Sequence, residues 1–226
     1  MSGMLQEAKE FLIKSQKLNL ILVGINVVVF AVLSLMGDTG SSLFMLQHGA
    51  GYAPAVLQGE YYRLFTAMFL HFSLQHLVFN MICLLALGDL LERALGAWRY
   101  LAVYLLGGLA GNALSLAWEC HRAQAGGSYA VSAGASGAVF AVIGAMLWIV
   151  LKRRYQQKKR VQDHPLYANT AQEGILRIPP GRMALAAALM ILQGLTDQGV
   201  DNAAHIGGLA AGFALAALLK TKGRRG

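Results

Sequence analysis

The chain has 226 residues, of which 56% are hydrophobic and only 13% are charged. A soluble domain is nearer one quarter charged, so this composition predicts a membrane protein with several spans and excludes disordered and fibrous classes. The net charge of +8 does not indicate nucleic-acid binding, because most Lys and Arg residues lie in the two tails and one loop, as topology signals do.

Cysteine placement argues against a metal site. Cys83 falls in a predicted span and Cys120 in a predicted loop, so we expect no disulfide, and no zinc-ligand spacing occurs. We therefore expect neither a metal nor another cofactor. The first seventeen residues are charged and have no long apolar core, so no cleavable signal peptide is visible.

Six apolar segments follow one another along the chain. The first is long enough to cross about 30 Å of hydrocarbon at 1.5 Å per residue. After it comes a long loop, 37–72, whose aromatic patch at 61–65 is expected to lie in the membrane interface. The six expected spans are about Leu18–Met36, Ser73–Leu91, Tyr100–Trp118, Ser136–Leu151, Met183–Leu195 and Asn202–Leu219.

The positions of Lys and Arg predict the orientation of the bundle. The basic segments are the N-terminal tail 1–17, the loops 92–99 and 152–182, and the C-terminal tail 220–226. By the positive-inside rule these segments are cytoplasmic, and the loops 37–72, 123–135 and 196–201 face outward. The sequence thus predicts an all-α membrane protein with one six-helix transmembrane domain, 18–219, and both termini in the cytoplasm.

Spans two, four and six start on the outer side, and each carries polar residues near that end. His76 and Asn80 are four residues apart and share one face of the second span. Ser136 opens the fourth span, and His205 lies in the first turn of the sixth. Polar groups inside apolar spans are functional-site candidates, because a membrane helix has no cheap way to carry them.

Small residues at intervals of four predict which helices approach each other. Such faces let helix backbones pack closely in lipid, and their contact would bring Ser136 within reach of His205. Sequence alone leaves that contact as a hypothesis. The two sets are Gly137, Ala141 and Ala145 in the fourth span, and Ala204, Gly208 and Gly212 in the sixth.

The fourth span has only about sixteen residues, roughly 24 Å of helix, which is short of the hydrocarbon thickness. The glycine-rich loop before Ser136 is therefore expected to dip into the protein, next to a water-accessible pocket that opens outward.

These residue types fit nucleophilic catalysis. A serine hydroxyl becomes a good nucleophile when a base accepts its proton, and His205 can do this for Ser136. The resulting oxyanion needs donors, which the Ser136 N–H, the Asn80 amide and the His76 ring can supply. Asp201 lies one turn before His205, where it can either cap the helix or orient the base. We interpret it as a helix N-cap, so a Ser-His dyad is expected rather than a triad.

Residues around the serine have expected supporting roles. Gly134 and Ala135 precede it and are assigned to the oxyanion and substrate-binding region, where a glycine allows a tight turn and close approach. Phe140, one turn after the serine, can pack against His205. His71 is interpreted as a loop anchor rather than a catalytic residue.

Three motifs in this order make the chain resemble a rhomboid intramembrane serine protease over nearly its whole length. They are His71-Phe72-Ser73-x-x-His76-x-x-x-Asn80, Gly134-Ala135-Ser136-Gly137 and Ala204-His205-x-x-Gly208-x-x-x-Gly212. The six-span form resembles the basic bacterial type, which implies a multi-pass protein of the bacterial plasma membrane. Tyr62-Arg63 resembles the family's Trp-Arg pair with Tyr in place of Trp, and Phe140 stands where many bacterial members have Tyr.

The resemblance implies Ser136 as nucleophile, His205 as general base, and His76, Asn80 and the Ser136 amide as oxyanion donors. It implies that the substrate is a single-pass membrane protein whose helix unwinds near the outer surface, and that cleavage follows a small residue. The fifth span would be the flank by which substrate enters. The oligomeric state does not follow from it.

Other classes fit less well. A transporter or channel favours central charges or broken helices, and a metalloprotease needs a motif such as H-E-x-x-H, which is absent. An aspartyl protease needs two intramembrane aspartates, and Asp89 stands at the end of its span. A non-catalytic rhomboid-like protein that binds membrane clients remains the alternative, although such relatives typically lack the Ser or the His.

Overall fold

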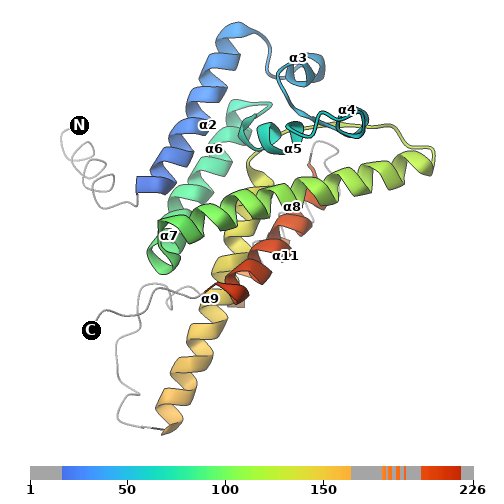
Figure 1. Ribbon diagram of the computed structural model, residues 1–226. Helices are drawn as coiled ribbons and strands as arrows, with labels where there is room; N and C mark the ends of the chain where they lie inside the picture. The colour runs from blue at the N-terminus through green and yellow to red at the C-terminus, as the bar shows by residue number, and fades with distance from the viewer. Residues whose placement is uncertain are drawn as a thin grey trace, which may run out of the picture.

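The computed structural model describes residues 17–163, 180–181, 183–184, 187–188, 191 and 200–219, and it is mostly helical (Figure 1). Within these residues, four helical segments are long and apolar enough to cross a membrane, and a fifth apolar helix is shorter. The two expected tails and most of the expected fifth span lie outside the described residues.

Helix α2 (Lys17–Met36) forms the first expected span and lies at one edge of the bundle beside α6 (Figure 1). Most of its Leu, Ile and Val side chains point away from the protein; Val28, for example, is 61% exposed. Only Asn19, Leu22, Asn26 and Leu33 are buried. An apolar helix that covers so little protein surface is suited to a lipid environment.

The expected outer loop is a compact set of short elements at one end of the molecule (Figure 1). They are α3 (Ser42–Gln47), β1 (Gly51–Tyr52), α4 (Ala53–Leu57), α5 (Arg63–Thr66) and the 3₁₀ turn η1 (Ala67–Phe69). The buried Arg63 binds them together, donating to the carbonyls of Leu46 (2.7 Å) and Ala50 (3.0 Å) and pairing with Glu60 (2.6 Å). An Arg fork thus satisfies backbone acceptors that a loop leaves unpaired.

One departure from the all-α expectation is a two-stranded antiparallel pairing. β1 pairs with β2 (Val131–Ser132), with Gly51 opposite Ser132 and Tyr52 opposite Val131. The pairing joins the first outer loop to the segment that leads into Ser136. It therefore helps to position the serine loop.

The second expected span is one continuous helix from Leu74 to Leu95, and it contains a wide turn. It consists of α6 (Leu74–Cys83), the π-helical turn η2 (Leu84–Gly88) and α7 (Asp89–Leu95). A π turn frees a carbonyl from the helical ladder. Here the Asn19 amide fills the gap by donating to the Leu84 carbonyl at 2.9 Å, and it accepts from the Tyr100 hydroxyl at 2.6 Å.

The assignment of Glu92 to a loop was wrong. Glu92 lies in α7 and is only 4% exposed. Its carboxylate accepts from the backbone N–H groups of Asn19 (2.8 Å) and Leu18 (3.4 Å) in the first turn of α2. These donors have no intrahelical partner, so burying the carboxylate against them satisfies both sides.

Helices α8 (Ala97–Gln124), α9 (Ser136–Asp163) and α11 (Asn202–Leu218) form the centre of the molecule (Figure 1). The first two have 28 residues each, about 42 Å. The expected short fourth helix was therefore wrong at its C-terminal end, because the basic segment 152–160 continues the helix. Lys, Arg and Gln are good helix formers, so nothing in that segment stops it.

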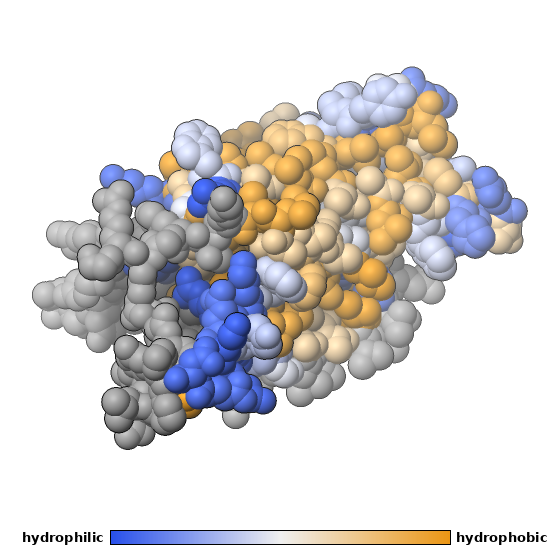
Figure 2. Space-filling model, turned by 60° about the horizontal axis from the view of Figure 1, so that its bottom comes forward, coloured by the Kyte–Doolittle hydropathy of each residue, from blue (hydrophilic) through white to orange (hydrophobic). Residues whose placement is uncertain are grey.

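The visible face of the molecule shows a hydrophobic band between hydrophilic ends (Figure 2). The basic residues at the end of α9, from Lys152 onward, lie beyond the apolar half of that helix. An apolar belt with charged ends is the surface that a bilayer-embedded protein presents.

Candidate active site

Ser136 is the first residue of α9 and is half-buried. The preceding turn is held from two sides, since Gly134 N–H donates to the Ala67 carbonyl at 2.9 Å and Ala135 N–H contacts Nε2 of His71 at 3.4 Å. Ala135 is fully buried. The expected inward packing of this loop is therefore observed, although it does not result from a short helix.

His71 is the anchor that the sequence analysis expected. It is fully buried between η1 and α6, and its ring centroid lies 5.0 Å from that of His76. Because Nε2 accepts from Ala135, the proton of the neutral ring belongs on Nδ1, which has no partner among the described residues. Burial lowers the pKa of His71 to about 3, with a smaller contribution from nearby His76, so the neutral form persists at physiological pH.

Gly134 lies between the side chains of His76 and Ser136. A Cβ atom built on this glycine would lie 2.8 Å from Nε2 of His76 and 3.6 Å from Oγ of Ser136. The first distance is too short for any real side chain, and the φ of +147° also favours glycine. The glycine therefore lets the His76 ring approach the serine.

The backbone N–H of Ser136 donates to no described residue. Ser136 opens a helix, and the first N–H groups of a helix have no acceptor within that helix. The N–H groups of Gly134 and Ala135 are engaged in the bonds given above. Asn80 is buried, but its amide donates to the His76 carbonyl one turn earlier at 3.1 Å. Of the expected oxyanion donors, the Ser136 amide is thus unoccupied, and the Asn80 amide is held by its own helix.

His205 lies in the first turn of α11 and is 6% exposed. Its ring stacks on that of Phe140, with centroids 4.2 Å apart and planes 11° from parallel. The expected packing of Phe140 on His205 is therefore observed. Parallel stacking restrains the imidazole to one plane, next to the helix that Ser136 opens.

No carboxylate orients His205 in the described part of the chain. Nδ1 of this ring is buried and without a partner, and no hydrogen bond joins Ser136 Oγ to the ring. Free active sites often hold such pairs apart until substrate binds. The unpartnered Nδ1 fits a dyad better than a triad.

Asp201 is the N-cap of α11, as expected. Its Oδ1 accepts from Ala204 N–H at 2.9 Å, and its Oδ2 accepts from the Ser115 hydroxyl of α8 at 2.5 Å. The carboxylate therefore ties the start of α11 to α8.

Glycine and alanine place α9 against α11, as the spacing of small residues predicted. A Cβ at Gly208 would collide with the Gly137 carbonyl, and one at Gly212 with the Ala141 carbonyl. A Cβ at Gly111 of α8 would lie 2.7 Å from the Ala204 carbonyl, so the third helix also fits against α11. This backbone contact brings Ser136 and His205 to neighbouring positions.

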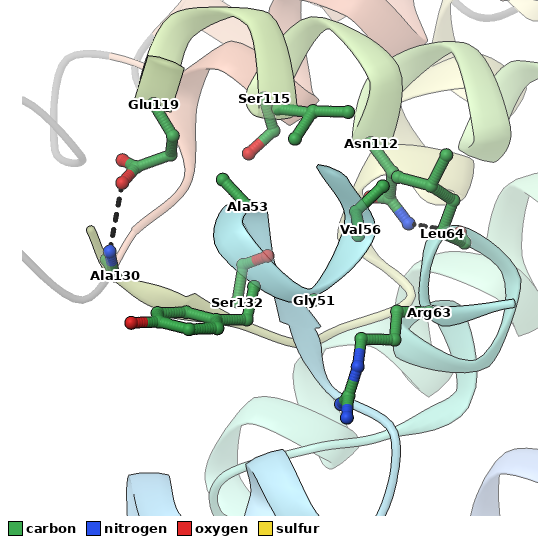
Figure 3. Close-up of a pocket in the computed structure, with 12 residues that line it drawn as sticks. Gly51, Ala53, Val56, Arg63, Leu64, Asn112, Ser115, Glu119, Ala130 and Ser132 are labelled. Atoms are coloured by element: carbon green, nitrogen blue, oxygen red, sulfur yellow. Dashed lines mark hydrogen bonds between the residues drawn. The ribbon is translucent and has the colours of Figure 1, made fainter. Parts of the chain in front are cut away.

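Ser136 lines a pocket at the N-terminal ends of α9 and α11, and Asn112 from the middle of α8 forms part of its wall. Gly134, Gly137 and Ala204 contribute small residues to its wall, and Asp201 contributes a carboxylate. A second pocket beside it lies between α8 and the outer loop, and the two have Asn112 and Ser132 in common (Figure 3).

Comparison with known proteins identifies the family. The rhomboid domain matches residues 58–222, which is most of the chain. This chain belongs to the rhomboid family. The three rhomboid motifs of the sequence lie within that match.

Individual rhomboid relatives are similar over most of this chain. Rhomboid protease GluP of Bacillus subtilis is 29% identical over 87% of this rhomboid and 34% of its own length. RHOMBOID-like protein 5 of Arabidopsis thaliana is 33% identical over 73% of this chain and 46% of its own length. Rhomboid protease AarA of Providencia stuartii is 28% identical over 86% of this chain and 69% of its own length. The chain thus spans less than half the length of the first two relatives.

Two polar contacts of this rhomboid, one at the site and one at α2, were missed by the sequence analysis. The Ser115–Asp201 bond was not expected, although Ser115 is a polar residue in an apolar span and so carried the same signal as His76. The Asn19–Glu92 network was also missed, and an Asn in the first turn of an apolar helix was its signal.

Proposed function

We propose that this chain is an intramembrane serine protease that cleaves transmembrane segments of single-pass membrane proteins near the outer face of a bacterial plasma membrane. The observation that carries the proposal is the position of Ser136. It opens α9 with a free N–H, borders a pocket, and neighbours His205, whose ring Phe140 holds in one plane. The relatives named as proteases support the same reading.

The reaction would proceed by acyl transfer. His205 accepts the Ser136 proton as Oγ attacks the scissile carbonyl, and the new oxyanion is stabilised by the Ser136 N–H, with His76 and Asn80 as further donors. His205 then gives the proton to the departing amine. A water molecule, deprotonated by the same ring, hydrolyses the acyl-enzyme and restores the serine.

The Asn80 amide can serve this role with its second N–H. In the resting arrangement one N–H donates to the His76 carbonyl at 3.1 Å, which leaves the other for the oxyanion. Such a donor acts only when negative charge develops, so it stabilises the transition state more than the bound substrate.

The proposed topology has six spans, with both termini in the cytoplasm and the pocket of Ser136 open to the outer side. The position of the basic end of α9, opposite to the outer-loop elements, supports this orientation (Figure 1). The partners are then transmembrane substrates and lipid, with no nucleic acid, metal or other cofactor in the reaction.

The deciding experiment is fluorophosphonate labelling of the purified protein, followed by cleavage of a transmembrane reporter in liposomes. Ser136→Ala and His205→Ala should each abolish labelling and reduce cleavage by at least about a thousandfold. Ser132→Ala is the matched control, because Ser132 borders the same pocket four residues earlier and should leave labelling intact. Unchanged labelling in Ser136→Ala would refute the mechanism, and a folded wild type that neither labels nor cleaves would favour a client-binding protein.

A further inference from the structure

The pocket that Ser136 lines also contains a carboxylate that the proposed mechanism does not use. Among the described residues of its wall, most are glycine or alanine, and the polar ones beside Ser136 are Asn112, Ser132 and Asp201. A carboxylate beside a nucleophile is a costly feature in an otherwise small-residue pocket, because burial disfavours the charge. It therefore calls for a chemical explanation.

The Asp201 carboxylate keeps free hydrogen-bonding capacity. An ionised carboxylate has about four lone-pair sites, and the donors around Asp201 are the Ala204 and Ala203 N–H groups and the Ser115 hydroxyl, which leaves capacity for one more. It forms no ion pair with any described Lys, Arg or His residue. Burial raises the pKa of Asp201, and the bond from Ser115 acts against that shift.

Asn112, in the same wall, also presents an acceptor. It donates one amide N–H to the Leu64 carbonyl at 2.7 Å, and its amide oxygen accepts from no described residue (Figure 3). Asn112 and Ser115 lie on the same face of α8, toward the pocket that both line (Figure 3). The oxygens of Asn112 and Asp201 thus offer acceptors to a donor group that enters the pocket.

The cations nearby are committed elsewhere. The Arg63 guanidinium binds Glu60 and the Leu46 and Ala50 carbonyls. Arg122 pairs with Glu119 at 3.0 Å, and Glu119 also accepts from Ala130 N–H at 2.9 Å (Figure 3). Neither guanidinium pairs with the Asp201 carboxylate, so a hydrogen-bond donor of the substrate is the available partner.

In the acyl-enzyme, the residue that supplies the scissile carbonyl is bonded to Ser136 Oγ, so its side chain lies beside this pocket. We propose that Asp201 is a specificity-determining residue, which selects substrates whose residue on the amino side of the scissile bond donates a hydrogen bond. The inference rests on the protease function proposed above. The small residues of the wall restrict that side chain in size, so serine is the preferred residue and alanine its poorer isostere.

The test measures kcat/KM for two transmembrane reporters that differ only in Ser or Ala at that position. A hydrogen bond to a charged group has a net value that corresponds to about tenfold or more in rate, so the wild type should prefer Ser by at least that factor. Asp201→Asn should remove the preference, because Asn still caps the helix through its oxygen but turns an N–H group to the pocket. Glu119→Gln is the matched control and should keep it.

When the Ser-to-Ala ratio of kcat/KM is compared between the wild type and a variant, any intrinsic difference between the two reporters cancels. Equal cleavage of both reporters by the wild type overturns the inference and leaves the protease function standing. A preference that survives in a folded Asp201→Asn variant also overturns it. If that variant does not fold, the wild-type ratio still decides, together with protection from fluorophosphonate labelling by peptide aldehydes ending in Ser or Ala. Failure to cleave either reporter would instead refute the protease function itself.

Discussion

Helices α2 and α9 are both apolar enough to cross a membrane, but they meet different surroundings. Within the most apolar stretch of each helix, 22% of the α2 residues and 67% of the α9 residues are buried inside the protein. The outward face of α2 carries large branched side chains, whereas α9 meets its neighbours through Gly137, Ala141 and Gly144. In lipid, the outer and inner faces of a helix bundle are both apolar, so residue size rather than apolar character distinguishes them.

The two helices are also attached by different physical means. α9 is held by close packing of backbones over its apolar half. α2 is held by packing around Leu22 and by a few buried polar contacts, chiefly from Asn19 and Asn26. Substitutions in the two helices should therefore fail in different ways.

The largest difference is expected for one substitution made at two glycines. Gly208→Leu places a side chain against the Gly137 carbonyl and should separate α11 from α9, with a loss of about 3 kcal/mol or more and of all activity. Gly24→Leu in α2 meets open space and should change the stability by no more than about 1 kcal/mol. Thermal unfolding in detergent measures both, and equal effects would contradict the packing argument.

A second pair sharpens the role of the serine loop. Gly134→Ala places a methyl group against the His76 ring and should reduce kcat by about tenfold to a hundredfold. Gly126→Ala is the matched control, because Gly126 also has a positive φ, +90°, and a Cβ there meets nothing within 4 Å. Reporter cleavage should fall only in the first variant. A similar loss in both would mean that backbone strain, and not His76, explains it.

A third prediction concerns the attachment of α2. Glu92→Gln keeps the shape of the side chain but replaces two charged hydrogen bonds to the first turn of α2, and it should cost about 1–3 kcal/mol. Asp163→Asn, at the exposed end of α9, should change little. Hydrogen exchange should show the loss of protection at the N-terminal end of α2 first. Uniform loss across the bundle would argue against a local capping role.

The last prediction is a pH dependence from His71, which is small near neutral pH. Its folded pKa of about 3 lies below the usual value near 6.5, so the unfolded chain binds a proton that the folded one refuses. Stability is therefore present above pH 6.5 and is lost as the pH falls toward 3, by about 2 kcal/mol at pH 5. His71→Phe should flatten this part of the dependence. Melting temperatures from pH 7.5 to 5 measure it, and parallel curves for both proteins would exclude the linkage.

The sequence predicted the parts of the site that depend on period and residue size. The spacing of Gly208 and Gly212 identified the α9–α11 contact, and the position of Asp201 identified the cap, because both follow from local helix geometry. The stacking of Phe140 on His205 followed from the same contact. Each of these inferences depends on the geometry of only one helix or one pair of packed helices.

What sequence could not predict depends on distant partners. Nothing local indicated that Glu92 would be buried, since its acceptor role exists only because α2 begins beside it. The end of α9 was misjudged because charged residues signal the end of a span without ending a helix. The Asn80 amide donates one N–H to its own helix and keeps the other, and composition does not encode that arrangement.

The polar attachment of α2 has a consequence for synthesis on the ribosome. Asn19 finds its partners Leu84, Glu92 and Tyr100 between 65 and 81 residues further along the chain. At 5–20 residues per second, those partners emerge roughly 3–16 s after Asn19 itself. Over that interval, the first helix must wait in the bilayer with its asparagine unsatisfied. We expect such a helix to be the segment most dependent on an insertion chaperone, and the last to dock during translation.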